Sequence, residues 1–209
     1  MIRVRVRPSM VGPDDLEPAV GALQSGGVVA FPTETFYGLA VDPRSAAAVK
    51  RVFALKRRAP DHPLPLIASG VDQIADHVGT MTPLAGRLAA RGWPGPLTLI
   101  IPASIHLCDD VHLSTGNVAV RVPADPVARA LARSAGHAIT CTSANISGDP
   151  PAATPEHVVA SFASGIDVLI DTGPTPAGLA STIVDATGDA PVLVRAGAIP
   201  WERVLEFSK

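Results

Sequence analysis

Polar side chains that could bind a ligand gather where predicted strands of this sequence end. After a short apolar strand at 27–31, Pro32 breaks the chain and is followed by two threonines, Glu34 and the only tyrosine, Tyr37. Ligands bind at the carboxyl ends of strands in open α/β sheets, so this segment is a candidate binding site. A turn capped by threonine hydroxyls is the alternative, and for this segment alone it is the more common case.

Basic residues concentrate at the end of a predicted helix. Lys50, Arg51, Lys56, Arg57 and Arg58 supply five of the 17 positive charges within nine residues. A lysine point charge beside planar arginine forks suits a polyphosphate. Cations that complement the dipole of a solvated helix end are the alternative, and composition does not choose between the two.

A third segment, 140–148, crowds small hydroxyls and an amide at the end of an apolar strand, around Cys141, Ser143 and Asn145. These groups allow close backbone approach and offer neutral donors to phosphate or carboxylate oxygens. An Asx- or Ser-turn explains the same residues equally well.

Two predicted strands carry lone arginines. Arg121 shares a strand face with Ala119, and Arg195 ends the apolar stretch 192–194. An arginine beside small residues could clamp a carboxylate. It could equally lie on the solvent face of an edge strand.

The elements that must position these groups alternate between strands and helices. The helical spacing is clearest at 45–58, where Val49, Val52, Phe53 and Lys56 recur every three or four residues. Apolar or alternating stretches predict strands at 2–6, 27–31, 64–68, 97–101, 118–122, 138–142, 168–170, 182–184 and 192–194. Helical spacing predicts helices at 14–26, 45–58, 71–78, 83–91, 126–135 and 155–164. This order predicts an α/β (α+β) fold with a mixed β-sheet flanked by helices.

Composition limits the class of protein. The chain has 209 residues, 47% hydrophobic and 17% charged, with a net charge of −2, which excludes intrinsic disorder and a histone-like balance. Its length predicts a single domain over 1–209. Two cysteines are too few for a disulfide framework. We find neither a signal-peptide pattern nor an apolar stretch that could cross a membrane, and therefore expect no membrane association and a cytoplasmic location.

Common sequence motifs for nucleotide, metal and acyl chemistry are absent. The sequence contains no Walker-type phosphate loop, no G-x-G-x-x-G, no C-x-x-C or H-E-x-x-H, and no G-x-S-x-G. We therefore expect no protein-bound metal site.

Six stretches, taken together and in order, resemble the YrdC-like family of threonylcarbamoyl-adenylate synthases over about 18–199. They are Phe-Pro-Thr-Glu-Thr-Phe-Tyr-Gly-Leu (31–39), Lys-x-Arg with His-Pro-Leu (56–64), Trp-Pro-Gly-Pro-Leu-Thr (93–98), Val-Ala-Val-Arg-Val-Pro (118–123), Thr-Ser-Ala-Asn-x-Ser-Gly (142–148) and Ser-Thr-Ile-Val-Asp (181–185). Each stretch alone would be weak evidence, whereas their joint order is specific.

The resemblance implies a nucleotidyltransferase with a twisted mixed sheet around a concave, positively lined cleft. Such an enzyme converts L-threonine, bicarbonate and ATP into threonylcarbamoyl-AMP and pyrophosphate, with Mg²⁺ arriving on ATP. Downstream threonylcarbamoyl-transfer proteins then use the product to modify tRNA. Because the sequence ends soon after the matching region, we expect a stand-alone core.

The resemblance also implies roles for individual residues. Lys56 and Arg58 are the expected catalytic residues and hold phosphate oxygens. The expected threonine pocket contains Thr35, Arg121 and Cys141. The residues expected to bind ATP are Lys56, Arg58, His62, Asn117, Ser143, Asn145, Ser181 and Arg195. As groups on the surface of a cleft, Lys56 and Arg121 should be replaceable by alanine with loss of activity but little change in melting temperature.

Two other functions remain open. Arg3, Arg5 and Arg7 alternate onto one strand face and, with the cluster at 50–58, could make an RNA-binding or ribosome-associated module with weak RNA contact. Ile67 and Pro151 stand where the family commonly has a histidine and a serine, so adenylation of a different carbamate is the other alternative.

Overall fold

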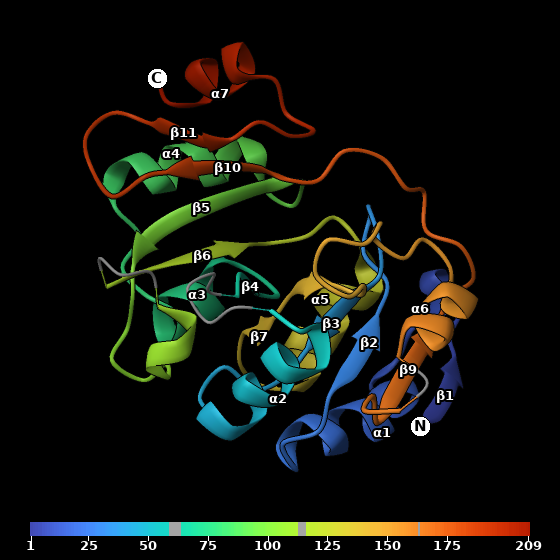
Figure 1. Ribbon diagram of the computed structural model, residues 1–209. Helices are drawn as coiled ribbons and strands as arrows, with labels where there is room; N and C mark the ends of the chain where they lie inside the picture. The colour runs from blue at the N-terminus through green and yellow to red at the C-terminus, as the bar shows by residue number, and fades with distance from the viewer. Residues whose placement is uncertain (59–63, 113–115, 163) are drawn as a thin grey trace.

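The protein folds into two mixed β-sheets with helices packed around them (Figure 1). The computed structural model describes residues 1–58, 64–112, 116–162 and 164–209. The predicted mixed α/β architecture is confirmed, but the strands divide between two sheets where a single one was expected. The N-terminus lies beside the first sheet and the C-terminus beyond the second.

The first sheet has the strand order β1-β9-β2-β3-β8 within the described residues. Its strands are β1 (Ile2–Arg5), β2 (Val29–Phe31), β3 (Gly38–Ala40), β8 (Thr142–Ser143) and β9 (Val168–Asp171). β9 runs parallel to both β1 and β2, whereas β3 is antiparallel to β2 and to β8. This sheet therefore brings the segment that follows β2 close to residues more than a hundred positions later.

The second sheet has the order β11-β10-β5-β6-β4-β7 in the part of the chain that the structure describes. Its strands are β4 (Leu66–Ile67), β5 (Leu97–Pro102), β6 (Asn117–Arg121), β7 (Ile139–Thr140), β10 (Thr182–Asp185) and β11 (Val192–Arg195). β10 is parallel to β5 and antiparallel to β11, so the C-terminal hairpin extends this sheet beyond β5.

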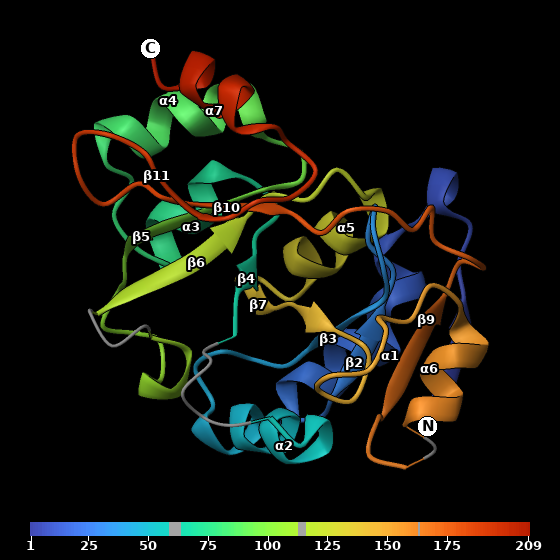
Figure 2. The same ribbon diagram turned by 45° about the horizontal axis from the view of Figure 1, so that its top comes forward.

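Seven α-helices in the described ranges cover the sheets. They are α1 (Pro13–Gln24), α2 (Ala46–Lys56), α3 (Val71–His77), α4 (Pro83–Gly92), α5 (Pro126–Ser134), α6 (Pro155–Ser161) and α7 (Trp201–Phe207). Two short 3₁₀ turns, η1 (Pro8–Met10) and η2 (Asp109–Val111), lie between them. Figure 2 shows α4 and α7 together on the outer side of the second sheet, where the two helices are in contact.

Local sequence explains where several helices begin. The side chains of Ser45, Thr82, Asp125 and Thr154 each accept a hydrogen bond from the backbone N–H three residues later, at the first turns of α2, α4, α5 and α6. Three of these helices start with proline, whose missing N–H costs nothing at that position. α2 ends at Arg57, which adopts the left-handed conformation with φ 51°.

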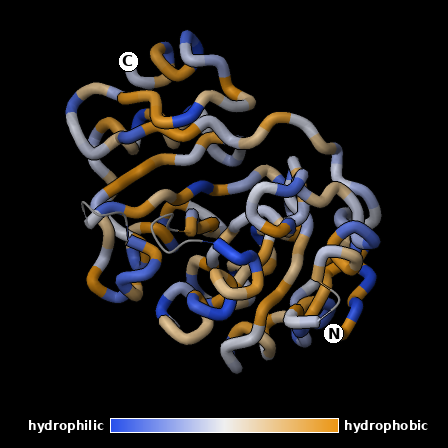
Figure 3. Tube along the Cα trace, viewed as in Figure 1, coloured by the Kyte–Doolittle hydropathy of each residue, from blue (hydrophilic) through white to orange (hydrophobic). Residues whose placement is uncertain are grey.

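The apolar core forms two clusters. The larger one includes side chains from both sheets, with Leu39, Leu66, Leu99 and Leu169 among its buried members. The smaller one contains side chains of the first sheet and of helices α1 and α5, together with Ile67 of β4 and Ile139 of β7 in the second sheet. Figure 3 shows the hydrophobic colour running along β5 and β2, as expected for strands buried on both faces.

One extended segment belongs to both sheets. The sequence predicts a single strand at 138–142, whereas the structure pairs β7 with β4 in the second sheet and β8 with β3 in the first. Cys141 is the residue between them, and its backbone N–H donates to the Pro65 carbonyl at 2.7 Å. A Cβ at Gly38 would lie 3.2 Å from the Phe31 ring and 3.3 Å from Cys141 Sγ, so glycine permits this close crossing.

Candidate functional site

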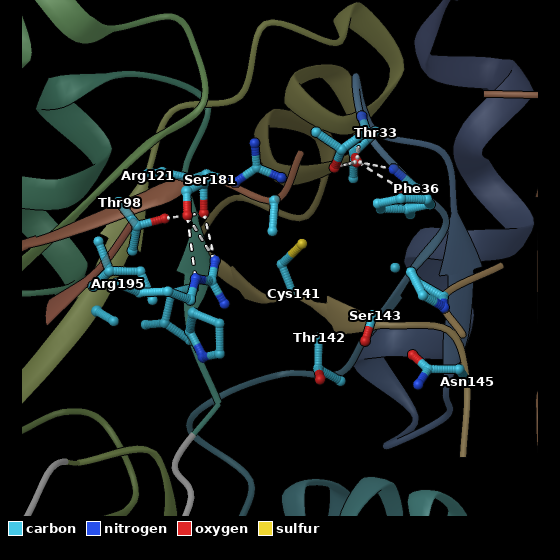
Figure 4. Close-up of a pocket in the computed structure, with 18 of the residues that line it drawn as sticks. Thr33, Phe36, Thr98, Arg121, Cys141, Thr142, Ser143, Asn145, Ser181 and Arg195 are labelled. Carbon is cyan, nitrogen blue, oxygen red and sulfur yellow. Dashed lines mark hydrogen bonds between the residues drawn. The ribbon is translucent and has the colours of Figure 1, made fainter. Parts of the chain in front are cut away.

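A cavity of about 450 Å³ lies where the two sheets meet (Figure 4). Its walls come from the ends of strands in both sheets and from the loops that follow them. The polar and charged lining residues are Thr33, Thr35, Tyr37, Arg58, Thr98, Arg121, Cys141, Thr142, Ser143, Asn145, Asp149, Ser181 and Arg195. Three arginines against one aspartate make the charged part of this lining predominantly basic.

The turn after β2 is held by one hydroxyl. Thr33 Oγ1 accepts hydrogen bonds from the backbone N–H groups of Thr35 and Phe36, at 3.2 Å each, and donates to the Phe36 carbonyl at 2.6 Å. Thr33 is 2% exposed, so this network is protected from water. The turn fixes the backbone of Thr35, whose side chain lines the cavity.

Arg121, at the end of β6, is buried and charged. It is 7% exposed, and its Nη1 donates to Oε1 of Glu34, the residue that follows Thr33 in the same turn. A buried guanidinium needs a counter-ion because desolvating an unpaired charge is costly. The pair therefore joins the first sheet's turn to the second sheet's strand at the edge of the cavity.

Cys141 lies beside Arg121 at the crossing between the sheets, and Figure 4 shows its sulfur pointing into the cavity. Burial raises the pKa of the Cys141 thiol, and the positive charge of Arg121 opposes that effect. The thiol is therefore protonated at neutral pH, as in a small lining residue rather than a reactive thiolate.

The loop after β8 is anchored by a buried lysine. Lys56 is 1% exposed, and its Nζ donates to the backbone carbonyls of Ser143 and Asn145, the latter at 2.7 Å. Burial, and the nearby charge of Arg58, lower the pKa of Lys56 to about 8. In addition, the Ser147 N–H donates to the Lys56 carbonyl at 2.9 Å. The end of α2 thus fixes the backbone of 143–147.

Asn145 closes this loop on itself. Its Nδ2 donates to the carbonyls of Ile146 at 2.8 Å and Asp149 at 2.7 Å, while its Oδ1 is buried and has no hydrogen-bond partner. Together with Ser143 it forms one wall of the cavity.

The opposite wall comes from the C-terminal hairpin. Thr98 and Ser181 share a hydrogen bond of 2.8 Å between their hydroxyls, and Arg195 Nη2 donates to the Ser181 carbonyl at 2.8 Å (Figure 4). Burial and the charge of Arg121 both lower the pKa of the Arg195 guanidinium. Residues about 60 to 160 positions from the turn after β2 thereby face the same cavity.

Most of the site residues predicted from the sequence lie together in this cavity. Those that line it are Thr35, Arg58, Arg121, Cys141, Ser143, Asn145, Ser181 and Arg195. Lys56 lies behind the wall, with its ammonium on backbone carbonyls and not toward the cavity. Asn117 begins β6 opposite Pro102, four residues from Arg121, and does not line the cavity. His62 lies outside the described residues.

Three residues that support the site had no role assigned from the sequence, although Glu34 and Tyr37 lie in a segment considered as a candidate binding site. Glu34 pairs with Arg121, Thr98 with Ser181, and the Tyr37 hydroxyl donates to the Gly173 carbonyl at 2.7 Å. Glu34 and Tyr37 stand in the stretch 31–39 and Thr98 in 93–98. Each of these residues therefore lies in a recognised motif, but its hydrogen-bond or ion-pair partner lies in another part of the sequence.

Two positions that motivated a different carbamate have different surroundings. Pro151 lines the cavity. The Ile67 side chain is fully buried in the smaller core cluster and does not line the cavity. A change at Pro151 would therefore act on the ligand directly, whereas Ile67 acts through packing.

The basic face at the N-terminus is partly neutralised. Arg3 forms ion pairs with Glu156 at 2.6 Å and Asp171 at 2.8 Å, and Arg5 approaches Asp171 at 3.7 Å. In the cluster at 50–58, Arg51 pairs with Asp167 at 2.9 Å. These contacts reduce the positive charge available to an RNA backbone.

A family model covers most of the chain. The model Sua5_yciO_yrdC, described as "Telomere recombination", matches residues 21–197. This chain belongs to the Sua5/YciO/YrdC family. The expected family membership is therefore confirmed.

Three curated relatives of this chain share one enzyme name. The chain is 39% identical over 186 residues to the threonylcarbamoyl-AMP synthase of Pyrococcus abyssi, a match that covers 89% of this chain and 55% of that protein. It is 45% identical over 154 residues to the enzyme of the same name from Alkalilimnicola ehrlichii, covering 74% and 80%. The Bacillus subtilis synthase matches at 39% identity over 54% of its length. The chain thus spans little more than half of the Pyrococcus and Bacillus relatives.

Solved structures of Sua5/YciO/YrdC proteins share the fold. Pyrococcus abyssi Sua5 complexed with L-threonine superposes with a TM-score of 0.90 at 37% identity, over 99% of this chain and 60% of that one. Escherichia coli YciO superposes with a TM-score of 0.88 at 23% identity, over 98% and 100%, which supports the fold alone.

Within the described residues, no helix is long and apolar enough to cross a membrane. Over the same ranges, no group of three or more histidine, cysteine, aspartate or glutamate side chains could hold a metal ion.

Proposed function

We propose that this chain is a nucleotidyltransferase that forms threonylcarbamoyl-AMP from L-threonine, bicarbonate and ATP, with release of pyrophosphate. The observation that carries the proposal is that one cavity combines a buried, glutamate-paired Arg121 with two walls of hydroxyls, an amide and further arginines. The names of the curated relatives and the threonine complex of Pyrococcus abyssi Sua5 support the same activity.

The amino-acid substrate binds at Arg121. A guanidinium at the end of a strand offers paired N–H donors that match a carboxylate. Thr35 and Cys141 line the same cavity, with one hydroxyl and one small thiol, and Cys141 lies beside Arg121. A side chain carrying a hydroxyl and a methyl group, as threonine does, finds both a polar and an apolar neighbour there.

ATP binds between the loop after β8 and the C-terminal hairpin. Ser143 and Asn145 lie on one wall, and Ser181 and Arg195 on the other. Arg58, at the end of α2, also lines the cavity and would hold phosphate oxygens. Lys56 positions the Ser143 and Asn145 backbone from behind, so its effect on the nucleotide is indirect.

The reaction requires negatively charged groups, a carbamate and the phosphates of ATP, to be held close together. It does not require a nucleophile from the protein. The threonine amine and bicarbonate combine to a carbamate with loss of water. A carbamate oxygen then attacks the α-phosphorus, and the bond to the bridging oxygen breaks so that pyrophosphate leaves. Arg58, Arg121 and Arg195 stabilise the charges that approach one another, and the walls hold the two substrates in line.

Magnesium would arrive as part of the ATP substrate. A Mg²⁺ bound to phosphate oxygens keeps several waters and needs at most one or two carboxylates from a protein. Asp149 is the carboxylate among the lining residues, and it suits one such contact. The ion would neutralise phosphate charge, and the protein would supply the arginines described above.

The product would pass to proteins that transfer threonylcarbamoyl to tRNA. A mixed anhydride of a carbamate and AMP is a reactive acylating agent, which suits consumption by a separate transferase. We also propose that 1–209 forms a single domain, since the larger apolar core includes side chains from both sheets. We place its activity in the cytoplasm, as a hypothesis that follows from the proposed role in tRNA modification.

Pyrophosphate release tests the proposal. Purified protein receives Mg·ATP and bicarbonate, with and without L-threonine, and L-serine replaces threonine in a parallel reaction. We expect release that depends on threonine and is weaker with serine. Release that is absent, or that is equal without an amino acid, would contradict the proposal. Preference for another amino acid would favour the different-carbamate alternative, and salt-sensitive RNA binding unaffected by ATP and threonine would favour the RNA module.

A further inference from the structure

The ion pair between Glu34 and Arg121 has an unusual geometry. Oε1 of Glu34 accepts from Arg121 Nη1, while Oε2 is buried and has no hydrogen-bond partner. The side chains are 17% and 9% exposed. A carboxylate with one orphaned oxygen is a costly arrangement, so its position calls for a functional reason.

Glu34 pairs with Arg121 without lining the cavity itself. Arg121 lines the cavity, whereas Glu34 is absent from its lining in the part of the chain that the structure describes. A guanidinium has five N–H donors in a fixed plane. Glu34 occupies a donor of Nη1, and the Cys141 thiol also interacts with the guanidinium. The guanidinium keeps further donors that a substrate carboxylate could use.

The backbone that carries Glu34 is itself fixed. Thr33 Oγ1 bridges the N–H groups of Thr35 and Phe36 and bonds back to the Phe36 carbonyl. The Thr175 hydroxyl donates to the Thr35 carbonyl at 3.1 Å. The turn therefore holds the Glu34 side chain in one place. Through the ion pair, the turn can also hold the plane of the Arg121 guanidinium in one orientation.

Charge also favours this arrangement. Arg121 and Arg195 are near enough for the charge of Arg121 to act on Arg195, so the two cations repel each other. Glu34 offsets that repulsion on the side of Arg121. Without Glu34, the Arg121 guanidinium would lose the contact that holds it against this repulsion.

We propose that Glu34 is a positioning residue that orients Arg121 for the carboxylate of the amino-acid substrate. This inference rests on the proposed function, and deepens it by assigning the geometry of the amino-acid subsite to a residue that does not itself touch the substrate. The effect falls on threonine and not on ATP, because Arg121 is the group that Glu34 holds.

The test compares Glu34→Gln with a matched control. Glutamine keeps the size of the side chain and an acceptor oxygen but removes the charge. Glu156→Gln makes the same change in an arginine-paired glutamate outside the cavity, where Glu156 bonds Arg3 at 2.6 Å. Pyrophosphate release gives KM for threonine and for ATP from one preparation, and their ratio does not depend on the fraction of active protein.

We expect Glu34→Gln to raise KM for threonine about tenfold, the difference between a charge-assisted and a neutral hydrogen bond, and to change KM for ATP less than about twofold. Glu156→Gln should leave both constants unchanged. Glu34→Asp, which keeps the charge on a shorter side chain, should raise KM for threonine less than Glu34→Gln. In an Arg121→Lys background, Glu34→Gln should have little further effect, because both changes act on one interaction.

Other results overturn the inference. An unchanged KM for threonine in Glu34→Gln shows that Arg121 needs no orientation by Glu34. A lowered KM shows that Glu34 competes with the substrate. An equal rise for threonine and ATP, together with a lowered melting temperature, shows a general structural role. If the wild type itself releases no threonine-dependent pyrophosphate, the proposed function fails first, and the two failures are distinguished.

Discussion

Replacing Lys56 with methionine separates the structural and functional roles of a buried cation. Methionine fills nearly the same length but cannot donate to the Ser143 and Asn145 carbonyls. The change therefore frees the loop after β8 from α2, apart from the backbone bond between Ser147 and Lys56.

The expected stability change is a difference between two opposing contributions. Each carbonyl that loses its donor in a buried place costs about 1–3 kcal/mol. Burial and the charge of Arg58 lower the pKa of Lys56 from 10.5 to about 8, and relief of that penalty returns about 3 kcal/mol. The net loss is about 1 kcal/mol, or about 2–4 °C in melting temperature for a chain of this length.

The functional change is larger than the stability change. Ser143 and Asn145 lose the contact that fixes their backbone, so we expect KM for ATP to rise about tenfold, the equivalent of about 1.4 kcal/mol. KM for threonine, which depends on Arg121, should change little. Pyrophosphate release under varied ATP measures the first effect, and calorimetry measures the second.

Lys50→Met is the matched control, because it makes the same substitution on an exposed position of α2. It should leave both KM and melting temperature at wild-type values. A Lys56→Met enzyme with wild-type KM for ATP would refute the view that Lys56 holds this wall of the cavity. A melting temperature of Lys56→Met more than about 10 °C below that of the wild type would show that burying the Lys56 charge costs much less than about 3 kcal/mol.

Further changes have defined outcomes. The unfolding free energy of the wild type, relative to that of Lys56→Met, should rise by up to about 3 kcal/mol between pH 8 and 10.5. The reason is that the Lys56 ammonium loses its proton near pH 8 in the folded protein but keeps it in the unfolded chain. Urea unfolding at several pH values measures this difference, and a difference that does not change with pH would contradict the prediction. Arg121→Ala should lower threonine-dependent pyrophosphate release at least about a hundredfold. It should also lower the unfolding free energy by about 3 kcal/mol, since Glu34 loses its counter-ion. Undiminished turnover would exclude Arg121 from the site. Tyr37→Phe removes the hydroxyl that donates to the Gly173 carbonyl, so calorimetry should find a loss of about 1 kcal/mol, and an unchanged melting temperature would mean that this bond contributes nothing.

Much of the cavity could be predicted from the sequence because its residues follow strands. The ends of β2, β6 and β11 were recognisable from apolar stretches, and Arg121 and Arg195 stood out as lone cations on them. The ends of β6 and β11 lie at one edge of the second sheet, so Arg121 and Arg195 gather there without any knowledge of loop geometry. The end of β2 belongs to the first sheet and reaches the cavity because the two sheets meet there.

Lys56 shows what the sequence left hidden. Its expected place at the surface of a cleft is contradicted by its exposure of 1%, and the same expectation for Arg121 is contradicted by an exposure of 7%. Because both side chains are buried, their replacement should also change stability, unlike that of surface groups. The helical spacing of Val49, Val52, Phe53 and Lys56 did contain the signal, because those three apolar residues are buried on the same side of α2. A lysine in the last turn is usually solvated, and only the carbonyls of a distant loop make its burial favourable.

The division into two sheets was equally hidden. The apolar run at 138–142 has the pattern of one continuous strand, and no residue type in it marks a change of partner. The change of partner follows from tertiary pairing. The first part of the segment pairs with β4 as β7, and the last part pairs with β3 as β8. For the same reason, the partner of Glu34 could not be deduced from the stretch that contains it.

The crossing at Cys141 fixes the distance between the two sheets beside the cavity through covalent geometry. One residue separates the pairing with β4 from the pairing with β3, so backbone length and not adjustable side-chain packing sets this distance. An added residue would reverse the alternation of Thr142 and Ser143 relative to β3 and also move the two sheets apart at this point. The space available to a ligand beside Cys141 is thereby set by chain length.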